Sequence, residues 1–125
     1  MKWYLKVMRD NYANYSGRAR REEYWMFTLF YFIFFIGLFV FLSILGALLG
    51  DDIGVNSGVL ILLIFIFAHF IPSLAVTIRR LHDTGKSGWY LLLQLIPYIG
   101  ALIILIFTVI EGDKNENKWG PNPKL

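Results

Sequence analysis

Three long runs without a charged residue constrain this chain more than any other feature of its sequence. They cover residues 24–50, 58–78 and 89–110. An α-helix needs about 20 apolar residues to cross the roughly 30 Å hydrocarbon core of a bilayer, so each run is long enough. A helix packed on a soluble core would need a polar face, and none of the runs has one. The sequence therefore predicts an all-α membrane protein with three antiparallel transmembrane helices.

Composition and length fit a single integral membrane domain over residues 1–125. Hydrophobic residues make up 57% of the chain, against about 45–50% in soluble domains. The first run is much longer than the apolar region of a cleavable signal peptide, so we expect it to remain in the protein. The chain has no cysteine, which excludes disulfides and thiolate metal sites, and we expect no metal or other cofactor.

The distribution of Lys and Arg residues predicts how the chain is oriented in the membrane. The first loop, residues 51–57, has no basic residue, and basic residues accumulate on the cytoplasmic side of membrane proteins. The N-terminus and the elbow, residues 79–88, are therefore predicted to be cytoplasmic, and the polar tail, residues 111–125, extracytoplasmic. We interpret the net charge of +3 as topology and contact with anionic lipid, and we expect no nucleic-acid partner.

The third run has an alternative interpretation. Pro97 and Gly100 lie near its centre, and proline removes a hydrogen bond from a helix. We expect a kinked spanning helix over residues 89–110. The alternative is a re-entrant hairpin, which needs protein around its broken backbone and would return the tail to the cytoplasm.

Residues 1–15 are predicted to form an amphipathic interfacial helix on the cytoplasmic leaflet. Basic side chains lie largely away from its apolar face, and each Lys or Arg near an anionic surface contributes about 1 kcal/mol to binding. The apolar face consists of Met1, Leu5, Met8, Tyr12 and Tyr15.

Two polar pairs are predicted inside the second and third runs. His69 and Tyr98 each lie nine residues inside their runs, counted from the elbow, so both should be about 13 Å deep. A short elbow makes the two helices neighbours, so we expect His69 to face Tyr98 and, at a shallower level, Ser73 to face Gln94. Such bonds usually contribute about 0.6–2 kcal/mol. A proton-carrying role of His69 is the alternative.

The elbow and the segment before the first run supply candidate ligand-binding residues. Arg79 has the spacing to pair with Asp83, and Arg18 with Glu22, while Glu23 can reach a basic group elsewhere. Two arginines near a leaflet can also bind phosphate, because a guanidinium group offers paired donors. The candidates for lipid or partner binding are Arg18, Arg21, Arg79, Arg80 and Lys86, with Trp25 and Trp89 as interface anchors.

Three strings carry a family resemblance. They are SGRARREEYW at residues 16–25, PSLAVTIRRLHDTGKSGW at 72–89 and NKWGPNP at 117–123. Together they resemble the bacterial domain-of-unknown-function family 805, and the resemblance spans nearly the whole chain. It implies a small multi-pass protein of the inner (plasma) membrane, and it implies no activity.

The sequence favours a non-enzymatic membrane protein that binds anionic lipid or a partner at its cytoplasmic face. It has no HExxH motif, no phosphate-binding loop and no recognisable nucleophile with its base, so we expect no enzymatic activity. The alternative is a subunit of an oligomeric transporter or channel in which His69, Gln94 and Tyr98 line a polar path. The small-residue pattern GALLG at residues 46–50 would support such a homo-oligomer.

Overall fold

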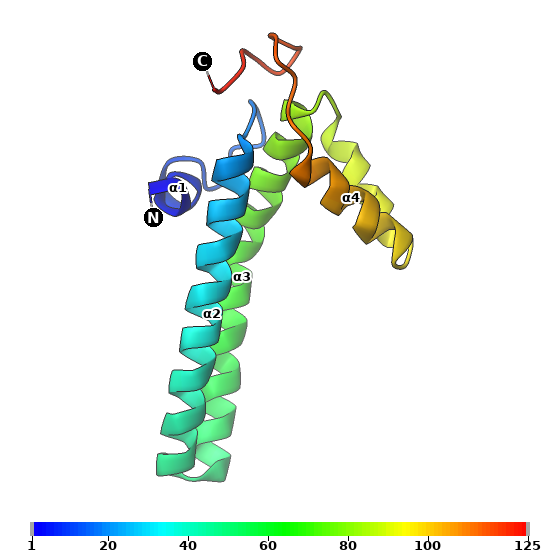
Figure 1. Cartoon of the computed structure of the whole chain (residues 1–125). Coiled ribbons are helices and arrows are strands. Elements are labelled where there is room, and N and C mark those ends of the chain that lie inside the picture. Colours follow the sequence, from blue (N-terminus) through cyan, green and yellow to red (C-terminus); the bar gives the residue numbers. More distant parts are fainter. Residues whose placement is uncertain (1, 125) are drawn as a thin grey trace.

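The protein is an antiparallel pair of long helices with shorter helical elements on both sides of one end (Figure 1). In this computed structural model, residues 2–124 are described, including all their side chains except those of residues 51–53. The regular secondary structure of the described residues is helical apart from one isolated bridge between Asn117 and Gly120, which confirms the all-α prediction. Its elements are α1 (Lys2–Leu5), the π-helix η1 (Lys6–Asp10), α2 (Arg21–Leu49), α3 (Asp51–Asp83), the 3-10 helix η2 (Gly88–Leu95) and α4 (Ile99–Val109).

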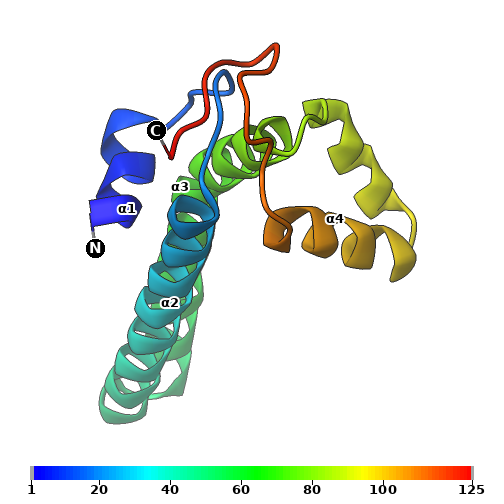
Figure 2. The ribbon, with the colours of Figure 1, turned by 45° about the horizontal axis from the view of Figure 1, so that its top comes forward.

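α2 and α3 lie side by side along their whole length in both views (Figures 1 and 2). The chain reverses at Gly50, whose φ of 100° is accessible to glycine at little cost. The predicted loop over residues 51–57 is wrong, because this one residue makes the turn and α3 begins directly after it. The helices then approach closely at Gly46, since a β-carbon on Gly54 would lie 2.5 Å from the Gly46 Cα. Gly46, the first residue of GALLG, thus packs α2 against α3 of the same chain.

The two long helices are suited to a bilayer. Residues Arg21–Leu49 and Gly54–Asp83 are long and apolar enough to cross a membrane. Only 11% and 22% of their most apolar stretches are buried in the molecule, whereas the core helix of a soluble protein would be mostly buried. Exposed apolar surface of this extent marks a site of contact with lipid or protein.

The third run does not form one continuous helix. η2 ends at Leu95, the chain turns at Tyr98 with a φ of 62°, and α4 then returns beside η2 (Figure 2). The two arms meet at Gly100, where a β-carbon would lie 1.6 Å from the carbonyl oxygen of Leu93. The predicted single helix over residues 89–110 is therefore wrong, and the segment has the hairpin shape of the alternative.

Both ends of this hairpin lie at the elbow end of the long pair. The backbone N–H of Asp113 in the tail donates to the carbonyl of Asp83 at 2.6 Å, and the N–H of Ala19 donates to the carbonyl of Arg79 at 3.0 Å. The tail, the elbow and the segment before α2 are therefore in contact. A bilayer cannot separate residues in contact, so the expected placement of the tail on the side opposite the N-terminus is wrong.

The N-terminal segment lies beside the long pair, on the side opposite α4 (Figure 1). The predicted helix over residues 1–15 starts at Met1, which lies outside the described residues, as does Leu125 at the end of the tail. Helical structure ends at Asp10, and Tyr12 and Tyr15 are exposed. The residues that pack are Tyr4, Val7 and Met8, which join Phe27 of α2 and Val76 of α3 in the apolar cluster.

Candidate functional site

Three buried arginines form the centre of the elbow end. Arg18, Arg79 and Arg80 are 8%, 3% and 0% exposed. With the buried carboxylates of Glu23 and Asp83 they make up what we call the elbow network. A buried charge is stable only when it is paired and hydrogen-bonded, so the partners of these groups determine their role. Within residues 2–124, no three His, Asp or Glu side chains are grouped so as to hold a metal ion.

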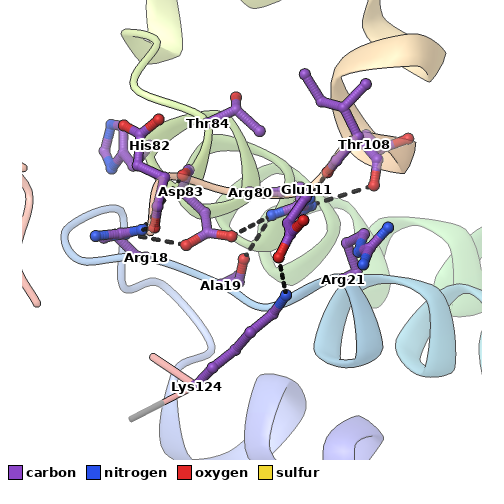
Figure 3. A network of polar contacts seen from close by, with 12 residues as sticks. Arg18, Ala19, Arg21, Arg80, His82, Asp83, Thr84, Thr108, Glu111 and Lys124 are labelled. Carbon is purple, nitrogen blue, oxygen red and sulfur yellow. Dashed lines mark hydrogen bonds and ion pairs between the residues drawn. The ribbon is translucent and has the colours of Figure 1, made fainter. Parts of the chain in front are cut away.

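Arg80 joins three parts of the chain (Figure 3). It lies one turn before Asp83 on α3, and its Nη1 donates to that carboxylate and, at 3.2 Å, to the carbonyl of Ala19. Its Nε donates to the carbonyl of Thr108 at 3.1 Å, and its Nη2 to that of Ile110. The planar guanidinium therefore connects the end of α3 to the segment before α2 and to the end of α4.

Arg18 fastens the tail to the same carboxylate. Its Nε donates to Asp83 Oδ1 at 2.9 Å (Figure 3). Its Nη1 donates to the carbonyls of Asn115 at 2.9 Å and Gly120 at 3.1 Å, and its Nη2 donates to that of Asp113. One carboxylate thus holds two guanidinium groups, and one of these orders the residues after α4.

Arg79 pairs with Glu23 across the two long helices. Its Nη1 donates to Glu23 Oε1 at 2.6 Å, and its Nε donates to the carbonyl of Asn14 at 3.1 Å. Lys6 Nζ lies 3.5 Å from the other Glu23 oxygen, while Arg79 Nη2 is buried without a hydrogen-bond partner among the described residues. Three guanidinium groups against two carboxylates leave the elbow network with one excess positive charge.

His82 anchors the tail through its ring and its backbone. Its Nδ1 donates to the carbonyl of Gly17 at 2.9 Å, and its ring stacks on Trp119 with centroids 4.6 Å apart and planes inclined by 7°. Asn117 Nδ2 donates to the backbone carbonyl of His82 at 2.9 Å and to the Asp113 carboxylate at 3.0 Å. The tail is therefore a bound part of the fold.

Three of the five predicted ligand-binding residues lie inside the molecule. Arg18, Arg79 and Arg80 direct their donors to carboxylates and backbone carbonyls of this chain. The hypothesis that Arg79 and Arg80 offer paired donors to a phosphate group does not fit this arrangement, because no exposed pair of donors remains. The expected pairs of Arg79 with Asp83 and of Arg18 with Glu22 are wrong, since Asp83 binds Arg80 and Arg18. The prediction that Glu23 reaches a basic group elsewhere is confirmed by its pair with Arg79.

The other predicted residues lie at the surface of the elbow end. Arg21 is exposed and donates to the carbonyl of Val109 at 3.2 Å. Lys86 donates to the carbonyl of Thr84 at 3.1 Å and lies 4.6 Å from the centre of the Phe107 ring. Of the two predicted interface anchors, Trp89 is 78% exposed, and Trp25 is 36% exposed with its Nε1 bound to the carbonyl of Thr108.

His69 is paired, but not with Tyr98. Its Nε2 lies 2.7 Å from the Tyr4 hydroxyl, and its Nδ1 lies 2.9 Å from the carbonyl of Phe65. A carbonyl only accepts, so the proton is on Nδ1 and Tyr4 donates to Nε2. Burial raises the pKa of Tyr4, which keeps this phenol a neutral donor. Tyr98 is 91% exposed at the tip of the hairpin, so the predicted pair with His69 is wrong.

The second predicted pair is also not formed. Gln94 is exposed on η2, and no hydrogen bond joins it to Ser73 in the part of the chain that the structure describes. The carbonyl of Ser73 accepts instead from the hydroxyl of Thr77 at 2.7 Å. One chain therefore does not bring His69, Gln94 and Tyr98 together along a polar path.

A second basic region lies at the N-terminal segment. The side chains of Lys2, Lys6 and Arg20 lie 5.0, 5.4 and 5.3 Å from the centre of the Trp3 ring. A hollow of about 360 Å³ beside them is lined in part by Arg9. We call Lys2, Lys6, Arg9, Arg20 and the central Trp3 the α1 basic surface. Sequence reasoning placed basic residues on this segment, but it did not identify Trp3 as the centre of the cluster.

Comparison with known proteins adds one family and several relatives. The family model described as "Protein of unknown function (DUF805)" matches residues 12–121. Inner membrane protein YhaH of Escherichia coli strain K12 is 49% identical over 125 residues, which cover 100% of this chain and 98% of YhaH. Inner membrane protein YhaI of the same strain is 43% identical over the same shares of both chains. No solved structure matches the chain.

Proposed function

The chain belongs to the DUF805 family, and we propose that it is a non-enzymatic protein of the bacterial inner membrane that binds anionic lipid through the α1 basic surface. The names of YhaH and YhaI support the location, and the two long apolar helices support membrane insertion. The lipid-binding role rests on one observation, the gathering of several cations around Trp3 beside the exposed apolar helices.

The distribution of charge supports a cytoplasmic elbow end. The turn between α2 and α3 has no basic residue, whereas the elbow end holds all 12 Lys and Arg residues of the sequence. Positively charged residues are retained on the cytoplasmic side of the membrane. In this topology α2 and α3 cross the bilayer, the η2–α4 hairpin enters the cytoplasmic leaflet and leaves it again, and both termini are cytoplasmic.

The position of α1 supports an interfacial role. Tyr4 of α1 stacks on Phe27 and contacts Phe34 of α2, about one turn to either side of residue 30. The remainder of α2, residues 30–49, rises about 28 Å at 1.5 Å per residue, close to the thickness of a hydrocarbon core. With this stretch in the core, α1 lies at the cytoplasmic interface and presents Lys2, Lys6 and Arg9 to lipid headgroups.

The α1 basic surface also has the chemistry of a headgroup site. Tryptophan favours the interface between hydrocarbon and water, and cations near an indole ring are attracted to its face. Lys2 has no carboxylate partner among the described residues. Lys6 shares the buried Glu23 with Arg79, Arg20 contacts Glu22, and Arg9 contacts Asp10, which also lines the hollow. The unpaired charge of Lys2 beside a hollow at the leaflet surface is suited to a phosphate group.

Removing two charges tests the proposal. In the double variant Lys2→Gln, Arg9→Gln, we expect weaker retention of phosphatidylglycerol and unchanged retention of phosphatidylcholine. At about 1 kcal/mol for each basic residue, the preference for the anionic lipid falls by up to roughly 30-fold at low salt. Native mass spectrometry of the purified protein titrated with each lipid measures both values, and raised salt reduces the preference of the wild type.

A matched pair of residues outside the α1 basic surface provides the control. Arg21→Gln with Lys114→Gln removes the same charge without changing a residue that lines the hollow beside Trp3, and Arg21 contacts the carbonyl of Val109 on the α4 side. The lipid preference of this variant should therefore stay near that of the wild type. An equal loss in both double variants would attribute binding to net charge and contradict a site on α1. An unchanged preference in the α1 variant would contradict it as well.

A further inference from the structure

A separate hollow lies between α3 and η2 on the other side of the long pair. It has a volume of about 490 Å³. The lining includes Leu74, Ile78 and His82 of α3, Ser87 and the η2 residues Gly88, Trp89, Leu91 and Leu92, and Tyr15 of the N-terminal segment. We call this hollow the elbow groove.

The two walls of the elbow groove change from polar to apolar in the same direction. His82, Ile78 and Leu74 are spaced by four residues, so they share one face of α3 over about 12 Å. On the opposite wall, Ser87 precedes η2 at the elbow, and Leu91 lies one turn farther along it. A ligand that fits both walls is polar at the elbow end and apolar at the other, which is the pattern of a lipid.

His82 provides a fixed acceptor at the polar end. Its side chain is largely buried, with the residue 6% exposed, and its ring is held by the Gly17 carbonyl and by the stack on Trp119. Because Nδ1 donates to a carbonyl, Nε2 of the neutral ring is left as an acceptor. Within residues 2–124, no hydrogen bond reaches this nitrogen. An acceptor on a wall of the groove calls for a ligand that carries an N–H or O–H donor.

The charges near the polar end define the ligand further. Lys118 Nζ lies 4.4 Å from the centre of the Trp119 ring that stacks on His82, whereas Lys86 Nζ contacts the carbonyl of Thr84 and the Phe107 ring. A cation beside an acceptor suits a headgroup with a phosphate next to a donor. We propose that the elbow groove binds one acyl chain of phosphatidylethanolamine, with the ammonium group donating to His82 Nε2 and the phosphate near Lys118.

Phosphatidylcholine is the matched comparison lipid. It has the same net charge and the same phosphate, but its quaternary ammonium has no N–H to donate to His82. A preference for phosphatidylethanolamine over phosphatidylcholine therefore measures the hydrogen bond to His82 Nε2. It does not depend on the charge effect proposed for the α1 basic surface. Either proposal can fail while the other stands.

Photo-crosslinking measures this preference directly. The full-length protein is incorporated into nanodiscs that contain either lipid with the same diazirine-bearing chain, and the labelled residues are mapped by mass spectrometry. We expect phosphatidylethanolamine to label residues 74–78 and 91–92 roughly three- to tenfold more than phosphatidylcholine, as one net hydrogen bond implies. Equal labelling by the two lipids would overturn the proposal, and so would labelling by neither.

Two substitutions at His82 distinguish loss of the hydrogen-bond acceptor from a disturbance of the fold. In His82→Asn the amide nitrogen lies where Nδ1 lies and can still donate to Gly17, but the acceptor at the position of Nε2 is lost. We expect the preference for phosphatidylethanolamine to disappear in this variant and to persist in His82→Gln, which keeps an oxygen acceptor near that position. A preference that survives His82→Asn would overturn the assignment of Nε2.

Filling the groove tests the acyl-chain site independently of the headgroup. Ile78→Trp should reduce labelling of residues 91–92 by both lipids, because the larger ring occupies the space between the walls. The control is Ile64→Trp, at a position of α3 that is 60% exposed outside this groove, and it should leave the labelling unchanged. Equal labelling in Ile78→Trp and the wild type would overturn the proposed path of the chain.

Discussion

Arginine at position 80 is required for its shape as well as its charge. The guanidinium of Arg80 reaches one carboxylate and three backbone carbonyls, and a lysine has a single nitrogen to offer them. We expect Arg80→Lys to lower the free energy of unfolding by about 3 kcal/mol, the lower part of the range for breaking a buried ion pair. Thermal unfolding in detergent measures this loss.

Arg21→Lys is the control for this prediction. Arg21 is exposed and makes one bond to a backbone carbonyl, so its replacement should change stability by less than about 0.5 kcal/mol. If Arg80→Lys instead kept full stability and lost bound anionic lipid, Arg80 would be a headgroup ligand and the elbow network would not be structural.

The bond between Tyr4 and His69 holds α1 against the long pair. We expect Tyr4→Phe to cost about 1 kcal/mol and to be non-additive with His69→Leu, because each change removes the same hydrogen bond. Tyr98→Phe should leave the stability unchanged and be additive with His69→Leu, because the Tyr98 side chain is exposed at the tip of the hairpin. Strict additivity for Tyr4 in thermal-unfolding cycles would contradict the pairing.

The same bond has a predictable dependence on pH. Because burial raises the pKa of Tyr4 above its ordinary value of about 10, the neutral phenol is favoured in the folded protein. The bond's contribution to stability is complete below the pKa that Tyr4 has in the unfolded chain. It is lost as the pH rises through the pKa that Tyr4 has in the folded protein. Between pH 7 and pH 9, wild type and Tyr4→Phe should therefore differ in stability by a constant amount, measured by unfolding at each pH.

Sequence reasoning identified the charged residues of the elbow but not their partners. Helical spacing relates residues within one helix, and it favoured Arg79 with Asp83. The partners that decide the site come from elsewhere in the chain, as Arg18 does for Asp83 and Glu23 does for Arg79. No pattern in the neighbouring sequence distinguishes an arginine that faces a lipid headgroup from one that donates to a backbone carbonyl.

At the scale of elements, the closest helix contact depends on a glycine. A β-carbon on Gly54 would lie 2.5 Å from Gly46 Cα, so Gly54→Ala must push α2 and α3 apart near the turn. We expect a loss of at least about 1 kcal/mol in stability, as is usual for overpacking. Gly37→Ala is the matched control, because nothing lies within 4 Å of its β-carbon and alanine favours a helix. A greater loss in Gly37→Ala than in Gly54→Ala, measured by thermal unfolding, would contradict this packing.

The elements also show where sequence patterns stop being informative. The lengths of the first two uncharged runs predicted the two long helices. The third run passed the same length test, yet it forms a hairpin, because the backbone turns at Tyr98, which takes a positive φ directly after Pro97. A proline alone does not end a helix in this chain, since α3 continues through Pro72. Hydropathy measures whether a segment prefers lipid, and it does not show whether the segment crosses the bilayer or returns.

At the scale of the whole molecule, the topology can be tested with single cysteines, since the sequence has none. We expect Asn56→Cys, near the turn between α2 and α3, to react with a membrane-impermeant maleimide added to intact spheroplasts. Asn122→Cys in the tail should react only after lysis, because both termini are expected in the cytoplasm. Labelling of Asn122→Cys in intact spheroplasts would contradict this topology and restore a third crossing.

The flanking elements make the molecule wider at one end than at the other. α1 and the η2–α4 hairpin extend to opposite sides of the elbow end, while the other end consists of two helices alone (Figure 1). In the proposed topology, the protein therefore displaces more lipid from the cytoplasmic leaflet than from the outer one. Such a wedge relieves strain where the bilayer bends with its cytoplasmic leaflet on the convex side, so the outline of this fold carries a preference for membrane curvature.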